Sequence, residues 1–408
     1  MKLIKNIILL FVSILFTLFL AEAILRLFYP APFFYSYPDK YVGHRRLPSA
    51  KGVAYGRKGE YKTYISINSI GFRDVEHAID KPKDVYRIVI LGDSFTEAIQ
   101  IPFDKIYSQL LLEKLKNLNY SKKIEIISLA CGAYGTAQQY LALKEYGMKY
   151  KPDLVILGFY EGNDVCDNSS ELAPQYDRIY VNTRPFYNLD NDGNLSLTPP
   201  SLEKIYKLYK PRDSYNRIKY FLRKNFVLYH LAKDLVFNNP RLAQLLMDLR
   251  LVNKQKIRDT ENIVYTKKGY PILYDVFKKK YDENWEKAWI ITYKILLMME
   301  ALCEENGADF FVMSIPSSIT VDIFFYNKRL NDYPSLKSVD IDINKPNRLM
   351  ENFLSRENID YLMLSDIFCA YIEKHPNQQL YLVYDGHLSG FGHEKVAGAL
   401  FEEIKQYL

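Results

Sequence analysis

Four short polar stretches of this chain carry residue types that could perform acyl transfer. They are Gly92-Asp93-Ser94, Cys131-Gly132-Ala133, Gly162-Asn163-Asp164 and Asp385-Gly386-His387. Acyl transfer from an ester needs a hydroxyl nucleophile, a base that takes its proton, an acid that orients the base, and N–H donors for the oxyanion. Ser94 can supply the nucleophile, His387 the base, and Asp385, two residues earlier, the orienting acid.

The oxyanion donors can come from three of the same stretches. They are the backbone N–H of Ser94, a backbone N–H at Gly132 or Ala133, and the side-chain amide of Asn163. One such donor typically lowers the barrier by about 3–4 kcal/mol. The choice between Gly132 and Ala133 stays open at this point.

The elements that precede these residues must bring them together. The apolar run Ile88-Val89-Ile90-Leu91 ends abruptly at Gly92-Asp93-Ser94, as a buried strand of a parallel sheet does. Apolar residues at mostly helical spacing follow, so Ser94 is expected where a strand passes into a helix. The other three stretches lie at or just after strand ends, and the carboxyl ends of parallel strands meet at one edge of a sheet.

The chain repeats this strand and helix alternation on both sides of one long interruption. Strands are expected at 86–92, 123–130, 154–159, 309–315 and 361–364. Helices are expected at 103–117, up to about residue 148, and at 282–306, 344–356, 365–374 and 391–407. This order predicts a parallel sheet with right-handed crossovers.

The order of the four stretches resembles that of the SGNH hydrolases, also called GDSL-type lipases and esterases. The matching blocks are Ile88–Thr96, Ser128–Gln138, Asp153–Asp164 and Asp385–His393. The resemblance covers about residues 84–165 and 287–408. It implies a flavodoxin-like three-layer α/β/α fold with a central five-stranded parallel sheet, and a site without metal or cofactor.

The chain is similar in particular to membrane-anchored, extracytoplasmic members of that family linked to cell-surface polysaccharides. Those often carry an Asn-x-x-Gly-Phe-Arg element before the first strand, as residues 68–73 do here. Two blocks depart from the usual pattern: Ser128 replaces an asparagine, and Ala133 occupies the place of the donor glycine. The last block has the shorter Asp-x-His spacing, also found in alginate-acetyltransferase-like SGNH proteins, and this indicates acyl transfer.

The same residues also have purely structural interpretations. Ser94-Phe95-Thr96-Glu97 matches a capping box, with Glu97 as a residue of the helix start. Asn163 and its neighbour Asp164 could cap a turn. His387 and His393, with Asp385, could ligate a metal, but no third strong ligand accompanies the two histidines. His393 is expected to pack or cap inside the last helix.

The first thirty residues precede the fold. Lys2 and Lys5 come before an uncharged apolar run over 6–21, and Ala21-Glu22-Ala23 fits a signal-peptide cleavage site. If the run continues through Phe28 it fits a membrane anchor, which we favour. Either interpretation predicts export, with the protein membrane-anchored and extracytoplasmic, or secreted after cleavage. The four cysteines have neither metal spacing nor the pattern of a disulfide framework.

The interruption at 166–286 has two features of its own. Asn191-Asp192-Gly193 predicts a hairpin turn; it also half-matches a calcium loop, but Pro199 stands where that loop needs glutamate.

Residues 201–283 hold 19 Lys and Arg against 9 Asp and Glu, while the whole chain has a net charge of +6. This basic, tyrosine-rich segment fits a helical cover with a solvated face. Contact with anionic lipid head groups or an acidic polysaccharide is the alternative.

The sequence thus predicts an anchor or signal peptide at 1–28, a linker packed on the body at 29–83, and an SGNH hydrolase domain at 84–408 with a basic helical insertion at 166–286. The expected activity is that of a serine esterase or O-acyltransferase acting on acyl groups, with acetyl favoured, of a cell-surface carbohydrate. The alternatives are a lipid or lysophospholipid esterase, and a non-catalytic carbohydrate-binding or assembly protein on the same fold. Nucleic acid is not an expected partner of an exported chain.

Overall fold

The computed structural model describes residues 2–28, 36–177, 180–181, 183–201, 203–204, 218, 221–222, 226–238, 245–246 and 269–408. The chain forms two compact units. The larger comprises Tyr35–Lys51, Tyr55–Tyr209 and Ile263–Leu408, and the smaller comprises Met1–Phe34, Gly52–Ala54 and Lys210–Asn262. All candidate site residues lie in the larger unit.

A five-stranded parallel sheet forms the centre of the larger unit. Its strands are β5 (Val85–Gly92), β6 (Lys123–Ser128), β7 (Leu154–Tyr160), β10 (Asp309–Ile315) and β11 (Asp360–Met363). They lie in the order β6-β5-β7-β10-β11, which is the flavodoxin-like order with its switch point between β5 and β7. The predicted fold class is confirmed. Every residue of β5 is buried, which explains its apolar run Ile88–Leu91, and its one charged residue, Arg87, pairs with Glu125 at 3.0 Å.

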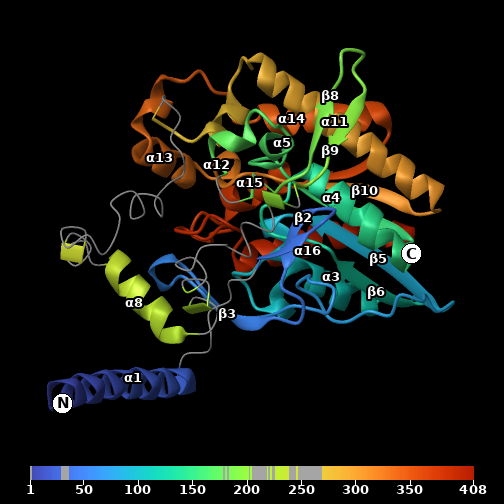
Figure 1. Ribbon diagram of the computed structural model, residues 1–408. Helices are drawn as coiled ribbons and strands as arrows, with labels where there is room; N and C mark the ends of the chain where they lie inside the picture. Colours follow the sequence, from blue (N-terminus) through green and yellow to red (C-terminus); the bar gives the residue numbers. More distant parts are fainter. Residues whose placement is uncertain are drawn as a thin grey trace. The chain divides into compact units, whose positions relative to one another are not determined.

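Helices cover both faces of this sheet (Figure 1). One face carries α3 (Tyr107–Lys116), α15 (Leu364–Lys374) and α16 (Gly390–Ile404), and the other carries α4 (Thr136–Ala142), α11 (Glu283–Glu305) and α14 (Lys345–Glu357). Two helices that the sequence did not indicate, α12 (Ser318–Val321) and α13 (Ile323–Asp332), follow β10. The core between the layers is large and apolar, with Trp285, Phe311 and Phe368 almost fully buried.

Short 3-10 and π segments connect several of these elements. They are η1 (Arg57–Gly59), η2 (Phe103–Lys105), η3 (Leu143–Gly147, a π-helix), η4 (Met148–Tyr150), η5 (Ala173–Gln175), η6 (Ile272–Phe277), η7 (Pro334–Ser338) and η8 (Lys405–Tyr407). The segments η3 and η4 continue α4 to residue 150, so the helix predicted to run to about residue 148 is present but changes its hydrogen-bonding pattern.

The segment expected to be a linker contains four short strands. They are β1 (Ser36–Asp39), β2 (Gly43–Arg46), β3 (Lys51–Tyr55) and β4 (Lys62–Ser66). Strands β1 and β2 pair in antiparallel fashion, and the Asp39 carboxylate closes their turn by accepting the N–H groups of Tyr41 and Val42 at 2.8 and 2.9 Å. Residues 36–46 therefore form paired strands within the larger unit.

The hairpin predicted in the interruption is present. Strands β8 (Phe186–Leu189) and β9 (Leu195–Thr198) pair in antiparallel fashion. The Asp190 carboxylate accepts the N–H groups of Asp192 and Asn194 at 2.9 and 2.8 Å, so it closes the turn itself. Of the predicted helical region, α8 (Val227–Asn238) is described. Most of the basic residues assigned to the predicted helical cover lie outside the described residues, namely Lys207, Lys210, Arg212, Arg217, Lys219, Arg223 and Lys224.

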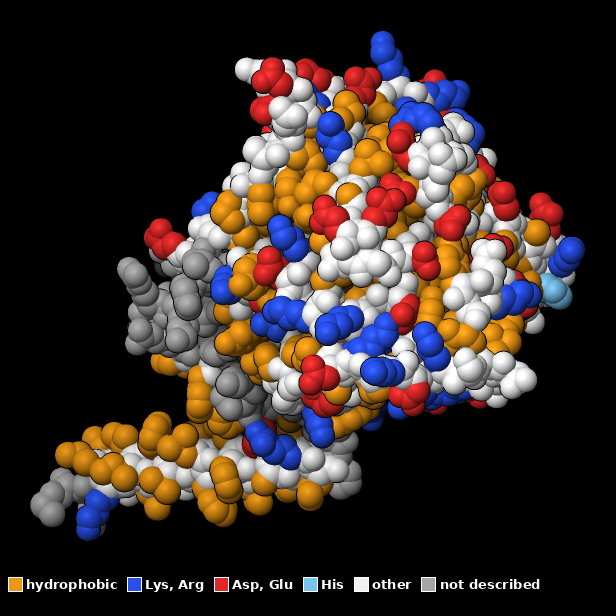
Figure 2. Space-filling model, turned by 90° about the vertical axis from the view of Figure 1, so that its right-hand side faces the viewer, with side chains coloured by type: hydrophobic (Ala, Val, Ile, Leu, Met, Phe, Trp, Pro, Cys, Tyr) orange, Lys and Arg blue, Asp and Glu red, His pale blue; other side chains and the backbone are white. Residues whose placement is uncertain are grey.

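The smaller unit contains the N-terminal helix α1 (Lys2–Phe28). It continues unbroken past Glu22, and its span Leu3–Leu27, with a mean hydropathy of 2.7, is long and apolar enough to cross a membrane. Figure 2 shows its surface as a band of hydrophobic side chains. The Glu22 carboxylate bonds Arg26 at 2.8 Å and accepts the N–H groups of Val227 and Leu228, which begin α8. Length and composition fit a membrane anchor and equally a signal sequence.

Candidate active site

The strand β5 ends in the turn that presents Ser94. Asp93 is the N-cap of the short helix α2 (Ser94–Glu97), and its carboxylate accepts the N–H of Phe95 at 2.8 Å. The capping-box interpretation, with Ser94 as the cap, is therefore wrong. As the first residue of α2, Ser94 keeps its hydroxyl available, and its backbone N–H has no acceptor within the described part of the chain.

Two glycines allow α2 to lie close to the ends of β5 and β7. A Cβ at Gly92 would lie 2.1 Å from Thr96 Oγ1, and a Cβ at Gly158 would lie 2.6 Å from the same atom. Thr96 cannot move aside easily, because it is buried and its hydroxyl accepts the Tyr107 phenol at 2.9 Å. The contact between the two strands and the nucleophile helix thus requires residues without a side chain.

We predict that Gly158→Ala displaces α2 and lowers both stability and activity. Overpacking of this kind typically costs about 1–3 kcal/mol, and the displaced atom here belongs to the helix that carries Ser94. Chemical denaturation and esterase rate measure the two effects. Gly398→Ala is the control for activity, because it lies inside α16 and the added Cβ would have no atom within 4 Å apart from the backbone of its own helix. Unchanged stability and activity in Gly158→Ala would contradict the packing described.

The structure brings the three predicted catalytic side chains into contact. The Ser94 Oγ lies 2.7 Å from the His387 Nε2, and the His387 Nδ1 bonds an Asp385 carboxylate oxygen. Ser94 and His387 are 293 positions apart in the chain. A bend with Gly386 at a φ of +89° turns Asp385 and His387 toward each other. The ring of Phe95 lies 4.7 Å from the imidazole and packs against it. The arrangement is that of a Ser-His-Asp triad.

Residues of the N-terminal segment, together with Gln100 just after α2, hold the acid of this triad. The Tyr61 phenol donates to Asp385 Oδ2 at 3.2 Å, and the Gln100 amide donates to Asp385 Oδ1 at 3.1 Å. The Glu60 carboxylate accepts the backbone N–H groups of Tyr384 and Asp385, the latter at 2.9 Å. Sequence reasoning did not find these contacts, since nothing in the pattern links residues 60 and 61 to residue 385.

The electrostatics of the triad favour a charged pair. Burial alone would lower the pKa of His387, but the hydrogen bond and charge of Asp385 raise it above its ordinary value. Burial likewise opposes ionisation of Asp385, yet the hydrogen bonds from His387 and Tyr61 hold its pKa below the usual range. A base that gains affinity for a proton from its carboxylate partner suits general-base catalysis near neutral pH.

The two alternatives for the second oxyanion donor are now distinguished. The N–H of Gly132 donates to Glu97 Oε2 at 2.6 Å, so it is not available to an oxyanion. The prediction of Gly132 as a donor is therefore corrected. The N–H of Ala133 has no acceptor within the described part of the chain. A Cβ at Gly132 would lie 3.6 Å from the Ser94 Cβ, so this turn runs directly beside the nucleophile. Ala133 has a φ of +66°, a left-handed conformation that the usual glycine adopts more easily.

Glu97 has a different role from the one expected of it. Instead of serving the helix start, its buried carboxylate binds the Arg46 guanidinium through both oxygens and also holds Gly132. The pair joins β2, α2 and the Gly132 turn behind the nucleophile. An arginine fork bonded to a carboxylate through two parallel hydrogen bonds fixes orientation as well as distance.

The Asn-x-x-Gly-Phe-Arg element stabilises the C-terminal end of α2. The Arg73 guanidinium is buried and donates to the carbonyls of Glu97, Ala98 and Ile101, with distances of 2.8 Å to Glu97 and 2.6 Å to Ile101. Asn68 closes the turn by accepting the Phe72 N–H at 2.9 Å. Carbonyls at a helix C-terminus carry partial negative charge and need donors. The element therefore stabilises the helix that presents Ser94.

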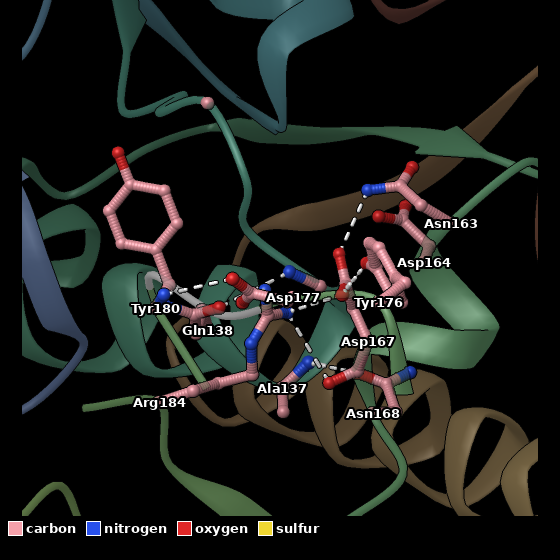
Figure 3. A network of polar contacts seen from close by, with 12 residues as sticks. Ala137, Gln138, Asn163, Asp164, Asp167, Asn168, Tyr176, Asp177, Tyr180 and Arg184 are labelled. Carbon is pink, nitrogen blue, oxygen red and sulfur yellow. Dashed lines mark hydrogen bonds and ion pairs between the residues drawn. The ribbon is translucent and has the colours of Figure 1, made fainter. Parts of the chain in front are cut away.

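Asn163 lies at the end of β7 as the N-cap residue of α5 (Asp164–Asp167). Its amide nitrogen donates to Asp167 Oδ2 at 2.9 Å, and Asp167 in turn pairs with the buried Arg184 at 2.9 Å. Figure 3 shows this chain of contacts, with Tyr176 also on Asp167 and Asp177 also on Arg184. An amide nitrogen has two hydrogens, so one can serve Asp167 while the other serves an oxyanion.

We predict that Asp167→Ala weakens catalysis by releasing the Asn163 amide. Loss of one oriented oxyanion donor costs about 10²–10³ in kcat, and a misaligned donor should cost about 10–100-fold. Asp177→Ala is the matched control, because Asp177 also pairs with Arg184, at 3.0 Å, but does not bond Asn163 in the described part of the chain. Steady-state kinetics on both folded variants measure the difference. Equal kcat values in the two variants would contradict this role of Asp167.

The remaining sequence alternatives at the site also have structural outcomes. His393 Nδ1 accepts the N–H of Tyr107 at 3.1 Å, so His393 caps α3, as expected. Among the residues that the structure describes, no group of three His, Cys, Asp or Glu side chains could hold a metal. The four cysteines, Cys131, Cys166, Cys303 and Cys369, are free.

Comparison with known proteins gives matches in structure only. No family model and no curated protein matches the chain. An acetyl xylan esterase matches with 14% identity over 78% of this chain and 98% of that one, at a TM-score of 0.38. A GDSL-like lipase from Bacteroides thetaiotaomicron matches with 11% identity over 81% and 93%, at 0.34. A catalytic mutant of an acetylxylan esterase from Geobacillus stearothermophilus matches with 11% identity over 78% and 94%, at 0.37.

The chain resembles an SGNH hydrolase in its sequence blocks, its sheet and its site. The resemblance lies in features of the chain itself. These are the order of the four blocks, the parallel sheet with Ser94 and Asn163 at its switch point, and the contacts of His387 with Ser94 and Asp385.

Proposed function

We propose that this chain is an SGNH-type serine esterase or O-acyltransferase that removes or transfers acyl groups, with acetyl favoured, on a cell-surface carbohydrate. The observation that carries the proposal is the 2.7 Å contact between Ser94 Oγ and His387 Nε2, with Asp385 on the far side of the imidazole. A hydroxyl and an oriented base at this distance are the parts that an acyl-enzyme mechanism needs.

In the first step the Ser94 Oγ attacks the acyl carbon and its proton passes to His387 Nε2. The negative charge that develops on the acyl oxygen is stabilised by the N–H groups of Ser94 and Ala133 and by the Asn163 amide. The bond from the acyl carbon to the leaving alkoxide then breaks, and the proton on His387 goes to that oxygen. The products are a free hydroxyl on the substrate and an acyl ester on Ser94.

In the second step a water or a sugar hydroxyl attacks the acyl-enzyme. His387 takes the proton of the attacking oxygen and returns it to Ser94 Oγ as the acyl ester breaks. Water yields a carboxylic acid, whereas a sugar hydroxyl yields a new ester. Asp385 remains a carboxylate throughout and stabilises the imidazolium that forms in both steps.

The surroundings of the triad support a carbohydrate substrate. Tyr384 precedes the catalytic Asp385 and is 45% exposed, and the Lys58 ammonium lies 4.4 Å from the centre of its ring. Glu60 and Tyr61 lie on the same side of the triad. An exposed aromatic ring with charged and hydroxyl groups next to it suits a hydroxyl-rich ligand, because such a ligand offers both apolar C–H faces and hydrogen-bonding groups.

We further propose that α1 anchors the protein to a membrane, with the SGNH-type site on the extracytoplasmic side. The apolar span of 25 residues supports an anchor, and Lys2 and Lys5 before it support an amino terminus inside the cell. A membrane-held esterase would meet surface glycans. Retention of the full-length protein in washed membranes tests this placement. Secretion of the protein after natural cleavage near Ala23 would show that α1 is a signal peptide and would contradict the anchor.

Two substrate series test the class of substrate. We expect release of acetate from acetylated xylooligosaccharides, and among p-nitrophenyl esters we expect acetate to be hydrolysed faster than longer chains. Both activities should be absent from Ser94→Ala. A rate that rises steadily with acyl-chain length would instead indicate a lipid or lysophospholipid esterase. Glycan binding without turnover in the wild-type protein would indicate the non-catalytic alternative.

A further inference from the structure

The peptide unit between Gly132 and Ala133 is held on one side only. Its carbonyl, on Gly132, lies 3.1 Å from the His44 Nε2, while its N–H, on Ala133, has no acceptor in the described part of the chain. A trans peptide is planar and its C=O and N–H point in opposite directions. A hydrogen bond that fixes the carbonyl therefore also fixes the direction of the Ala133 N–H.

His44 comes from β2 and is completely buried. Its ring stacks on Tyr180 at 4.0 Å and packs edge-on against Tyr134 at 5.2 Å. The Tyr134 phenol donates to the His44 carbonyl at 2.7 Å. The imidazole therefore cannot change its orientation without moving the aromatic rings on both of its sides.

The protonation state of His44 follows from its partners. A carbonyl oxygen only accepts, so the Nε2 must carry the hydrogen. The Nδ1 is buried and has no partner in the described part of the chain, which fits a neutral ring with a bare Nδ1. Burial also lowers the pKa of His44 to about 3. The donor is thus a neutral imidazole at any pH at which the triad works.

We propose that His44 is a positioning residue of the oxyanion hole, which holds the Gly132 carbonyl and so directs the Ala133 N–H at the acyl oxygen on Ser94. The proposal rests on the proposed function and adds a role for a residue outside the four SGNH blocks. The hydrogen bond from His44 helps to hold the peptide in place although Ala133 must keep a φ of +66°, which a glycine would adopt at less cost; a flipped peptide would present a carbonyl oxygen to the oxyanion. The donated hydrogen bond also polarises the peptide and strengthens its N–H as a donor.

Two variants of similar size test this role in the full-length protein. His44→Gln keeps an N–H near the position of Nε2, whereas His44→Met fills the same space without a donor. With p-nitrophenyl acetate we expect His44→Met to lose about 10–100-fold in kcat, with KM nearly unchanged, because an oxyanion donor acts in the transition state. We expect His44→Gln to recover most of that loss. A merely structural role would lower the folded fraction of both variants and leave the kcat of the folded protein unchanged.

His393→Gln is the matched control, because His393 is also buried and also bonds a backbone group through one ring nitrogen, but it lies in α16 and caps α3. We expect its kcat to equal that of the wild type. If His44→Met, purified as a folded monomer, keeps the wild-type kcat, or if His44→Gln is as impaired as His44→Met, the proposal is wrong.

A crystal structure of the wild-type protein with a phosphonate on Ser94 tests the role without any substitution. We expect the phosphonyl oxygen to accept the Ala133 N–H while the His44 Nε2 stays on the Gly132 carbonyl. A peptide that turns away from the phosphonate would overturn the proposal even if neither variant folds. Absence of any Ser94-dependent ester cleavage in the wild type would instead refute the proposed function, and the role of His44 with it.

Discussion

Ser94→Ala is expected to lower kcat for p-nitrophenyl acetate by about 10⁴–10⁶-fold, which is the usual size of the effect when a triad nucleophile is removed. The physical reason is that Ser94 has the only hydroxyl that bonds the His387 Nε2 among the described residues, so the proton transfer and the acyl ester are lost together. The measurement is steady-state release of p-nitrophenol at saturating substrate. Binding of the substrate should change little, because the oxyanion donors and the walls of the site remain.

Ser338→Ala is the control for this substitution. Ser338 is an exposed serine that donates to the Ser335 carbonyl at 2.8 Å, and its replacement should leave both kcat and KM at the wild-type values. Turnover by Ser94→Ala at more than about a tenth of the wild-type rate would not fit the residual activity of a disabled triad. Ser94 would then have no role in the mechanism.

Asp385→Asn is expected to lower kcat/KM by about 10³–10⁴-fold and to shift its dependence on pH. The base must be neutral to take a proton, and Asp385 raises the pKa of His387 above the ordinary 6.5. In the wild type, kcat/KM should therefore fall as the pH drops through a midpoint above 6.5. Without the Asp385 carboxylate, burial still lowers the pKa of His387 and only the more weakly acting charges of Asp93 and Glu97 still raise it, so the midpoint in Asp385→Asn should move to lower pH. The full pH–rate profile of each protein measures both effects.

Tyr61→Phe separates the charge of Asp385 from its position. The Tyr61 phenol donates to the same carboxylate at 3.2 Å, so its loss should slow the reaction by about tenfold, as expected when one hydrogen bond of about 1.5 kcal/mol is removed and the charge of Asp385 remains. A midpoint in Asp385→Asn equal to that of the wild type would mean that His387 is not the group that titrates. The assignment of the base would then be wrong.

The parallel sheet could be predicted because its signal is local. The strands β5, β7 and β10 are continuous apolar runs, each followed by a glycine, proline or polar turn, and such runs have few other interpretations. The order of the blocks also placed Ser94, Asn163 and the Asp385 and His387 pair at one edge of the sheet. The structure adds the distances between these side chains, which no spacing in the sequence determines.

Contacts between distant polar residues could not be predicted. Glu97 looked like a residue of a helix start, but its partners Arg46 and Gly132 are 51 and 35 positions away. The choice between Gly132 and Ala133 depended on that same contact. Sequence patterns report burial and turns, whereas the pairing of two particular polar side chains is decided only when the chain is folded.

The N-terminal segment was the least predictable part of the larger unit. Its strands β1 and β2 have four residues each, are rich in polar and proline residues, and show no apolar alternation. Nevertheless this segment supplies His44, Arg46, Glu60 and Tyr61 to the surroundings of the site. Short strands of this kind are stabilised by the body on which they pack, so their own sequence carries little signal.

The most direct test of the account is to trap the acyl-enzyme. Wild-type protein mixed with p-nitrophenyl acetate, quenched in acid within one turnover and digested, should yield a peptide containing Ser94 that is heavier by one acetyl group. The Ser94→Ala protein should yield no acetylated peptide. An acetyl group found on another residue, or turnover of the ester with no acyl-enzyme under any quench time, would contradict a mechanism in which His387 and Asp385 activate Ser94.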